Sequence, residues 1–350
     1  MKASKILSLF LAGTLLIITA CRKDDLSYEP IPLGPYETGI IIANEGSFSS
    51  PDASVSFLSS DLTQQQDDIF SRNNNSAVLG KVFQSIGMKG DKAYLVVNDP
   101  AKVEIVNRYT FQKSGSITTN LVQPRYIAFS ANYTYISNNN FSTTRKVNIY
   151  DNADNFVKSI DFDRYADKLS YSDGFVYVQS DGVKYDAIYN ELPTGHTISR
   201  INTTTNTMDK VVTLNDDAII RDMASDNTSI YVLTSDSSKT YFYKINSRTG
   251  NINQQLTFST IPDGKKLAVD KGIVYFITSG KKLYSMNGDQ ANFMFDVTAS
   301  SIYGFNIIDS KVFVSDPSFT QNNSVRIYNL SGTLMKTITT GIATNGFYKN

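Results

Sequence analysis

Short strand-like segments recur along this 350-residue chain at a nearly constant spacing. Each repeat centres on a run of β-branched and aromatic residues. The aromatic residues at the centres of these runs are Tyr94, Tyr135, Tyr177, Tyr231, Tyr275 and Phe313. The steps between them are 41, 42, 54, 44 and 38 residues. Repeats of ~40–45 residues made of strands are typical of the four-stranded blades of a β-propeller.

Each central run has the same flanking segments. A further strand-like segment follows it and ends in Asn or Asp. The last residues of these segments are Asn107, Asp151, Asn202, Asn246, Asn287 and Asn329. A tight turn comes next, clearest where Gly250, Gly288 and Gly332 can supply the positive φ that a hairpin needs. A last strand then closes the unit, as at residues 156–160, so six complete units are predicted.

The seventh unit is divided between the two ends of the chain. Residues 39–43 and 54–58 supply strands that have no inner strand before them, and residues 345–348 have no partner of their own. If the C-terminal segment pairs inside the first blade, the ring closes and no open sheet edge remains. We therefore predict an all-β, seven-bladed propeller with four-stranded antiparallel blades over residues 38–350. Two β-sandwiches are the alternative, but no linker interrupts the repeat.

The first twenty residues have the pattern of a lipoprotein signal peptide. Lys2 and Lys5 precede an apolar run at residues 6–18, which is too short to span a bilayer. The run leads into Ile-Thr-Ala-Cys, and Cys21 is the chain's one cysteine. We expect cleavage before Cys21 and lipidation of its thiol. An ordinary secretory signal that happens to contain a cysteine is the alternative.

The segment at residues 21–37 is predicted to be a tether between the lipid and the propeller. Pro30, Pro32 and Pro35 stiffen it, and it has no strand or helix periodicity. Acyl chains contribute about 0.8 kcal/mol per buried methylene, so a lipidated cysteine would hold the chain on its membrane without spanning it.

Composition argues against several classes of function. The 33 basic and 33 acidic residues balance, which gives no electrostatic case for binding nucleic acid. One cysteine and one histidine exclude a disulfide framework and a cysteine-based metal centre. The histidine, His196, has no cysteine partner, and Ser199 would face the opposite way on a strand. We expect no enzyme activity, no metal and no cofactor.

Two families of loops should converge at one end of the ring, where propellers usually bind ligands. One family enters each inner strand, and the other joins the second and third strands; both are rich in amides, arginines and aromatic residues. Aromatic side chains supply rigid contact area, while amide and guanidinium groups supply directed hydrogen bonds to a bulky polar ligand. Turn formation is the alternative explanation for the Asn, Asp and Ser residues. The predicted ligand-binding residues are Asn44, Glu45, Phe48, Gln84, Asn98, Arg125, Tyr126, Asn138, Arg164, Arg221, Tyr303 and Asp316.

An insertion at residues 180–197 accounts for the longest step between repeats. It carries Tyr185, Tyr189, Pro193 and His196. Extended loops on a propeller rim often cover a ligand or contact a partner. A surface loop without a binding role would show the same sequence pattern.

Several short motifs resemble the YncE-like propeller lipoproteins of the Bacteroidetes. They are found, in matching order, at residues 44–46, 78–80, 84–85, 96–98 and 124–126. The resemblance extends from about residue 38 to the C-terminus. Similar members are seven-bladed surface lipoproteins that capture vitamin B12 and related corrinoids and pass them to a TonB-dependent outer-membrane transporter. The resemblance implies the same fold, ligand class and partner here.

Residues 22–25, Arg-Lys-Asp-Asp, resemble the export signal that sends Bacteroidetes lipoproteins to the outer face of the outer membrane. We therefore expect a lipid-anchored protein on the cell surface that captures a bulky ligand, with cobalamin or a related corrinoid as the leading candidate. The alternatives are a protein- or glycan-binding surface scaffold and a propeller hydrolase or lyase.

Overall fold

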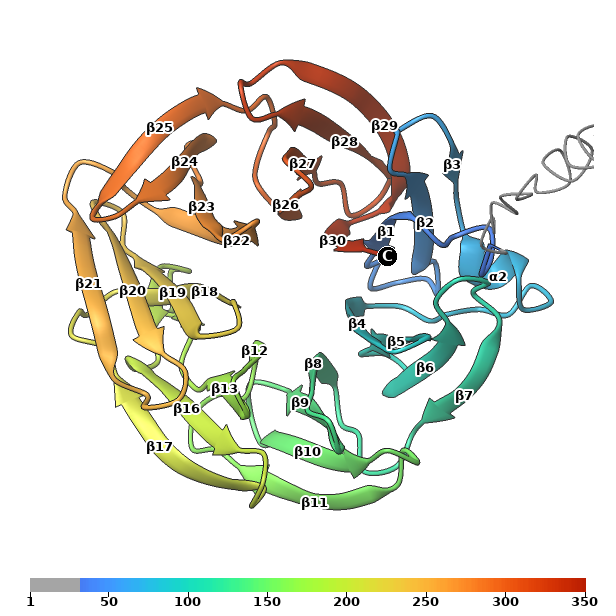
Figure 1. Cartoon of the computed structure of the whole chain (residues 1–350), viewed down its shortest axis with the longest axis horizontal. Helices are drawn as coiled ribbons and strands as arrows, with labels where there is room; N and C mark the ends of the chain where they lie inside the picture. Colours follow the sequence, from blue (N-terminus) through green and yellow to red (C-terminus); the bar gives the residue numbers. More distant parts are fainter. Residues whose placement is uncertain (1–31) are drawn as a thin grey trace, which may run out of the picture. The chain divides into compact units, whose positions relative to one another are not determined.

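The repeated strand segments form seven four-stranded antiparallel sheets around a central channel, as Figure 1 shows. The structure is a computed structural model that describes residues 32–350. It confirms the predicted all-β, seven-bladed propeller. The predicted signal peptide, Cys21 and the tether as far as residue 31 lie outside the described residues.

The first four blades have the following strands, from the channel outwards. Blade 1 contains β30 (Thr344–Lys349), β1 (Gly39–Asn44), β2 (Ser54–Ser59) and β3 (Gln65–Gln66). Blade 2 contains β4 (Phe83–Lys89), β5 (Lys92–Val97), β6 (Lys102–Asn107) and β7 (Lys113–Ile117). Blade 3 contains β8 (Pro124–Phe129), β9 (Tyr133–Asn139), β10 (Arg145–Asp151) and β11 (Phe156–Asp161). Blade 4 contains β12 (Leu169–Ser172), β13 (Phe175–Gln179), β16 (Thr197–Asn202) and β17 (Thr207–Thr213).

The remaining three blades each use four consecutive strands. Blade 5 contains β18 (Ile219–Ser225), β19 (Ser229–Ser235), β20 (Thr240–Asn246) and β21 (Ile252–Phe258). Blade 6 contains β22 (Gly264–Asp270), β23 (Ile273–Thr278), β24 (Lys282–Asn287) and β25 (Gln290–Asp296). Blade 7 contains β26 (Phe305–Ile308), β27 (Lys311–Asp316), β28 (Asn322–Asn329) and β29 (Leu334–Ile342).

The C-terminal strand closes the ring, as predicted. β30 pairs antiparallel with β1, and Ile41 lies opposite Tyr348. Blade 1 thus takes its inner strand from the end of the chain and its other three strands from the beginning. A buried side-chain contact reinforces this pairing, because the Thr344 hydroxyl donates to Asn44 Oδ1 at 2.7 Å.

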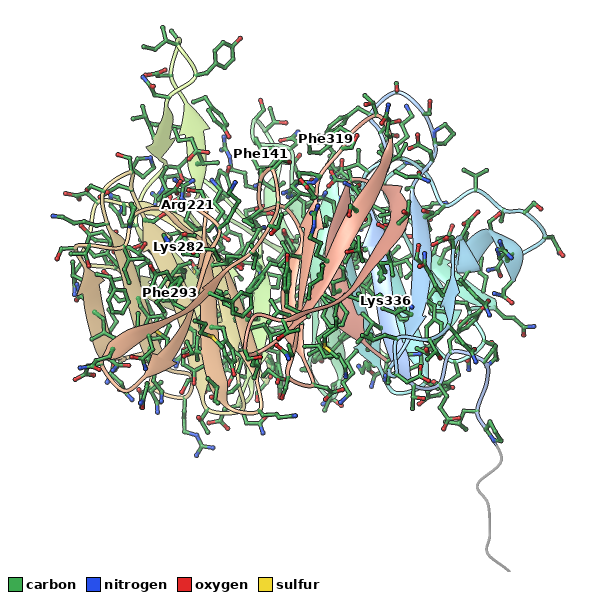
Figure 2. All side chains as sticks on the ribbon, turned by 90° about the horizontal axis from the view of Figure 1, so that it is seen from above. Phe141, Arg221, Lys282, Phe293, Phe319 and Lys336 are labelled. Carbon is green, nitrogen blue, oxygen red and sulfur yellow. The ribbon has the colours of Figure 1, made fainter. Side chains whose placement is uncertain are left out.

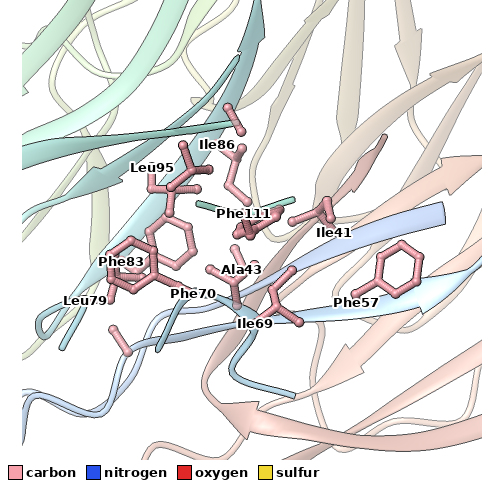
Figure 3. Packing of buried hydrophobic residues seen from close by; sticks show 14 of the residues in the cluster. Ile41, Ala43, Phe57, Ile69, Phe70, Leu79, Phe83, Ile86, Leu95 and Phe111 are labelled. Carbon is pink, nitrogen blue, oxygen red and sulfur yellow. The ribbon is translucent and has the colours of Figure 1, made fainter. Parts of the chain in front are cut away.

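The pattern of burial explains why the central runs are apolar on both faces. Blades stand face to face around the ring, so each face of an inner blade strand packs on a neighbouring blade. In β5 five of the six residues are buried, whereas the outermost strand β21 alternates between partly buried and exposed residues. Figure 3 shows one resulting core between blades 1 and 2, where Ile41, Phe83 and Phe111 are all fully buried.

Two elements lie outside the blade pattern. The short helix α2 (Ile69–Arg72) buries Ile69 and Phe70 in the core between blades 1 and 2. The insertion at residues 180–197 forms a small two-stranded sheet of β14 (Val183–Tyr185) and β15 (Glu191–Pro193) between β13 and β16. We call this insertion the rim hairpin. Over residues 32–350, no helix is both long and apolar enough to cross a membrane.

Candidate functional site

Exposed aromatic side chains gather at one end of the ring. We call it the loop end, because the loops entering the inner strands and those joining second and third strands meet there. Seven aromatic side chains of residues 32–350 are largely exposed, and five of them belong to second-to-third connections. These five are Phe48, Phe141, Tyr185, Tyr189 and Phe319. Figure 2 shows Phe141 and Phe319 toward the end from which the yellow-green rim hairpin projects. Such grouping of exposed apolar surface marks an interaction face.

A cavity of about 650 Å³ occupies the central channel, and all seven inner strands contribute to its wall. Its charged side chains stand where the inner strands begin, at the loop end. Five of the predicted ligand-binding residues line it, and they come from blades 1, 2 and 3 and from the loop before β26. These residues are Glu45, Gln84, Arg125, Tyr126 and Tyr303.

A β-bulge interrupts five of the inner strands at the loop end. The register shifts lie between Phe83 and Ser85, Pro124 and Ile127, Ile220 and Asp222, Gly264 and Lys266, and Thr344 and Gly346. A bulge inserts residues that have no partner opposite, so it changes which side chains face the channel. In β18, Asp222 lines the cavity and Arg221 does not.

Glu45 lies at the loop end of the channel and is almost fully buried. Its Oε1 accepts a hydrogen bond from Gln84 Nε2 at 3.2 Å. Its Oε2 accepts one from the Tyr303 hydroxyl and another from Asn345 Nδ2 at 3.4 Å. Burial raises the pKa of Glu45, and the hydrogen bond from Tyr303 opposes that effect only in part. Three blades are therefore joined at one carboxyl group.

The raised pKa of Glu45 predicts a pH dependence of stability. Because the folded state holds this proton more tightly than the unfolded state, the contribution to stability is complete below pH 4.5 and is lost as the pH rises through the folded pKa. The free energy of unfolding of the wild type relative to E45Q should thus fall with rising pH. Urea unfolding of both proteins between about pH 4 and pH 8 measures this difference, and a difference that rose with pH would contradict the assignment.

Arg125 connects the channel to the aromatic residues of the rim. Its Nε donates to Asp167 Oδ1 at 2.6 Å. Its guanidinium carbon lies 4.9 Å from the centre of the Phe141 ring and 5.9 Å from that of Tyr126. The cation is thus held by one carboxylate and by contacts with two aromatic faces, a geometry that favours arginine over lysine.

A second cavity, of about 760 Å³, lies between the blade 3 loop and the rim hairpin. Phe141, Tyr165, Val183 and Tyr185 form its apolar wall. The rings of Phe141 and Tyr165 are 5.4 Å apart at 59°, a tilted aromatic contact. Arg125, which lines the channel cavity, packs on Phe141 of this second cavity. We call the second one the rim cavity.

An ion pair holds the base of the rim hairpin. Asp181 is fully buried and accepts hydrogen bonds from Arg164 Nε at 2.5 Å and Arg164 Nη2 at 2.8 Å. The backbone and hydroxyl of Thr197 donate to the same carboxylate. Burial alone would raise the pKa of Asp181, but these hydrogen bonds outweigh it and hold the pKa below its usual value. Arg164 therefore stabilises the base of the rim hairpin through Asp181, at the edge of the rim cavity.

A second ion pair ties the hairpin to blade 5. Arg221 Nη1 lies 2.5 Å from Glu191 Oε2 on β15, and Arg221 Nη2 lies 3.6 Å from Asp263. The predicted ligand-binding residue Arg221 thus forms ion pairs with two carboxylates, those of Glu191 and Asp263. The hairpin is held at its base by blade 4 and at β15 by blade 5.

Comparison with protein families identifies the propeller. A family model described as "Domain of unknown function (DUF5074)" matches residues 38–340. The chain belongs to the DUF5074 family. The match covers most of the propeller, from the start of β1 into β29 of blade 7, and leaves out β30. Comparison with curated proteins finds no match.

Solved structures resemble this DUF5074 propeller in fold at low sequence identity. A functionally unknown protein from Desulfotomaculum acetoxidans aligns with a TM-score of 0.63 and 11% identity over 89% of this chain and 98% of that one. Hydrazine synthase of Kuenenia stuttgartiensis gives 0.58 and 12%, covering 78% and 95% of the two chains. The computationally designed protein Ika8 gives 0.57 and 11%, covering 88% and 90%. At such identities the likeness concerns the fold alone.

Three of the predicted ligand-binding residues hold loops of the DUF5074 propeller together. Asn44 and Asn138 are fully buried: Asn44 Nδ2 donates to Ser56 Oγ at 3.0 Å, and Asn138 Oδ1 accepts from the Val122 amide at 2.9 Å. Asn98 Nδ2 donates to the Pro124 carbonyl of the next blade at 3.3 Å. Asn44 and Asn138 do not fit the prediction, because a buried, hydrogen-bonded amide cannot contact a ligand.

Asp316 and Phe48 also lie apart from the two cavities. Asp316 accepts hydrogen bonds from the Ser300 amide at 2.8 Å and from Arg326 Nη1 at 3.1 Å, so it stabilises loops of blade 7. Phe48 is 73% exposed at the loop end and lines neither cavity. It remains available to a large ligand or to a partner.

Part of the channel lining was not predicted from the sequence. Lys168, Asp222 and Lys266 line the cavity, together with Asn345 of β30. A signal was present, because a charged residue recurs near the start of the inner strands of blades 3 to 6. Arg221 was predicted and Asp222 was not; the register shift between Ile220 and Asp222 leaves Asp222 in the channel wall.

His196 stands apart from both cavities. Its Nε2 lies 3.7 Å from Asp217, whose side chain is fully exposed. No group of three or more His, Cys, Asp or Glu side chains within residues 32–350 is placed to hold a metal ion.

Proposed function

We propose that this DUF5074 protein is a surface lipoprotein that captures a bulky small molecule at its loop end and delivers it to a TonB-dependent outer-membrane transporter. The observation that supports capture most directly is the pair of exposed aromatic side chains in the wall of the rim cavity. Phe141 and Tyr185 are both exposed and line this cavity. Exposed aromatic faces beside fixed cations suit a ligand that has both flat apolar surface and polar groups.

A corrinoid is the ligand we propose. This choice rests on the resemblance of residues 44–46, 84–85 and 124–126 to YncE-like lipoproteins, because the DUF5074 family leaves the ligand open. Corrinoids have a flat macrocycle with amide side arms. The faces of Phe141 and Tyr185 suit the macrocycle, and the polar groups Lys184 and Thr194 of the rim cavity suit the amides.

Membrane anchoring is the second part of the proposal. Cys21 would carry the lipid, and residues 22–25 would direct the protein to the cell surface. A lipid anchor restricts a capture protein to the plane of the membrane, which raises its effective concentration at a transporter. Mass spectrometry of the protein purified from membranes tests the lipid on Cys21.

Ligand binding is tested by calorimetry and difference absorption with cobalamin and cobinamide. We expect binding to the wild type and a loss of about tenfold or more in affinity for the double variant F141A/Y185A, since each aromatic contact contributes about 0.5–1.5 kcal/mol. Y171A is the matched control. Tyr171 is also exposed, but it lies beside turns at the opposite end of the ring and does not line the rim cavity. No heat and no spectral change at micromolar protein would reject the corrinoid.

A surface scaffold for a protein or glycan is the second candidate function. The tip of the rim hairpin favours it, because Ile188 is 77% and Tyr189 85% exposed. A scaffold should retain its partner from solubilised outer membrane without a small ligand. The variant I188S/Y189S should then lose that partner, whereas a corrinoid-capturing protein should keep its ligand affinity in the same variant.

A further inference from the structure

Within residues 32–350, the channel contains one basic side chain, that of Lys266, that forms no ion pair. Three basic residues line the cavity: Arg125, Lys168 and Lys266. Arg125 pairs with Asp167, and Lys168 pairs with Asp222. Among residues 32–350, none forms a hydrogen bond or an ion pair with the Lys266 ammonium.

The acids that line the cavity are already engaged. Asp222 Oδ1 accepts from Lys168 Nζ and from the Met223 amide at 2.9 Å, while its Oδ2 accepts from the Leu267 amide at 2.7 Å. Glu45 has hydrogen bonds to both of its oxygens, as described above. Neither carboxylate contacts Lys266. Leaving a partly buried ammonium without a partner is unfavourable unless a ligand supplies one.

Arg125 offers further donors in the same cavity. Within the described part of the chain, its guanidinium donates only its Nε–H, to Asp167. The terminal Nη groups form no hydrogen bond there, and their planar arrangement matches the two oxygens of a carboxylate or phosphate. Both Arg125 and Lys266 act electrostatically on Glu45, which places their charges around the same part of the channel.

We propose that the loop end of the central channel is a binding site for an oxyanion, either a carboxylate or a phosphate group of a ligand, with Lys266 as its charge partner and Arg125 as a second donor. Burial lowers the pKa of Lys266, and the charges of Asp222 and Asp167 oppose that effect only in part. The inference goes beyond the corrinoid proposal, since it concerns blade 6 and the channel, whereas the rim cavity lies beside blades 3 and 4.

Titration calorimetry of the purified protein with inorganic phosphate and, separately, with succinate tests the site at constant ionic strength. We expect one or both anions to bind, and succinamide, which has no charge, not to bind. K266M should weaken anion binding about 10- to 100-fold, because a hydrogen bond to a charged group contributes roughly 1.5–3 kcal/mol. K266R, which keeps the charge, should retain most of the affinity.

K282M is the control for a general loss of positive charge. Lys282 belongs to the same blade, and its exposed side chain pairs with Asp296 on the outside of the ring (Figure 2). Its variant should bind the anions as the wild type does. Thermal unfolding of K266M should remain cooperative, which separates lost binding from lost folding. The proposal is overturned if neither anion binds, if K266M binds like the wild type, or if K282M loses as much affinity as K266M. Failure of cobalamin binding would leave this result unchanged.

Discussion

Deletion of residues 343–350 is expected to abolish cooperative folding. The deletion removes β30, so blade 1 loses its inner strand and β1 loses the partner that faces the channel. Phe347 is buried in a core with Ile42 and Phe313, and its ring lies 5.5 Å from that of Phe313. Losing a buried Phe alone costs about 3–5 kcal/mol, and whole domains are stable by only about 5–15 kcal/mol.

Circular dichroism during heating measures this effect. F347A should keep the ring closed and lower the free energy of unfolding by about 3–5 kcal/mol. M335S, on the exposed outer strand of blade 7, should change it by less than about 0.5 kcal/mol. A truncated chain that melted cooperatively at the wild-type temperature would show that the ring does not need its C-terminal strand.

Replacing Asp222 by alanine should be the most damaging single substitution in the channel. Its carboxylate joins three blades, since it accepts from Lys168 of blade 4, Met223 of blade 5 and Leu267 of blade 6. The substitution would leave two buried amide groups without an acceptor and Lys168 without its ion pair. Removing one partner of a buried ion pair costs about 3–5 kcal/mol, so we expect D222A to be destabilised by that amount.

Urea unfolding of a small set of variants checks this expectation. D222N keeps one acceptor oxygen for one of the two amides, so it should lose less stability than D222A. The double variant D222A/K168M should recover part of the loss, because no unpaired lysine remains at that position. D91N is the control on an exposed turn and should lie within about 0.5 kcal/mol of the wild type. Equal stability of D222A and D91N would show that the three-blade link contributes little.

The blades were predictable because their signals are local. Runs such as the one around Tyr94, a following segment that ends at Asn107, and turns at Gly288 or Gly332 each depend on a few adjacent residues. The closing strand was predictable for a different reason: residues 345–348 had strand character and no partner nearby.

The lining of the channel was predictable only in part. Glu45, Gln84, Arg125, Tyr126 and Tyr303 line the channel, and their contact with a ligand stays a prediction. Lys266 and Asp222 were missed, because bulges in β18 and β22 alter which neighbouring side chain faces inward. Asn44 and Asn138 looked like loop residues free to bind, but their amides hold the loops in place.

By itself the sequence determined that this chain forms seven four-stranded blades and where each blade begins, because strand alternation and turn residues act over a few positions. The tertiary structure alone decided which side chains meet. Asp222 forms its ion pair with Lys168, which lies nearly a hundred residues before Lys266 in the chain, so Lys266 is left without an ion pair among the described residues. Arg125 contacts both Phe141 and Asp167 because these residues come to it from separate loops. Contacts between residues that are distant in the chain depend on blade packing and bulge geometry, and a local sequence pattern contains neither.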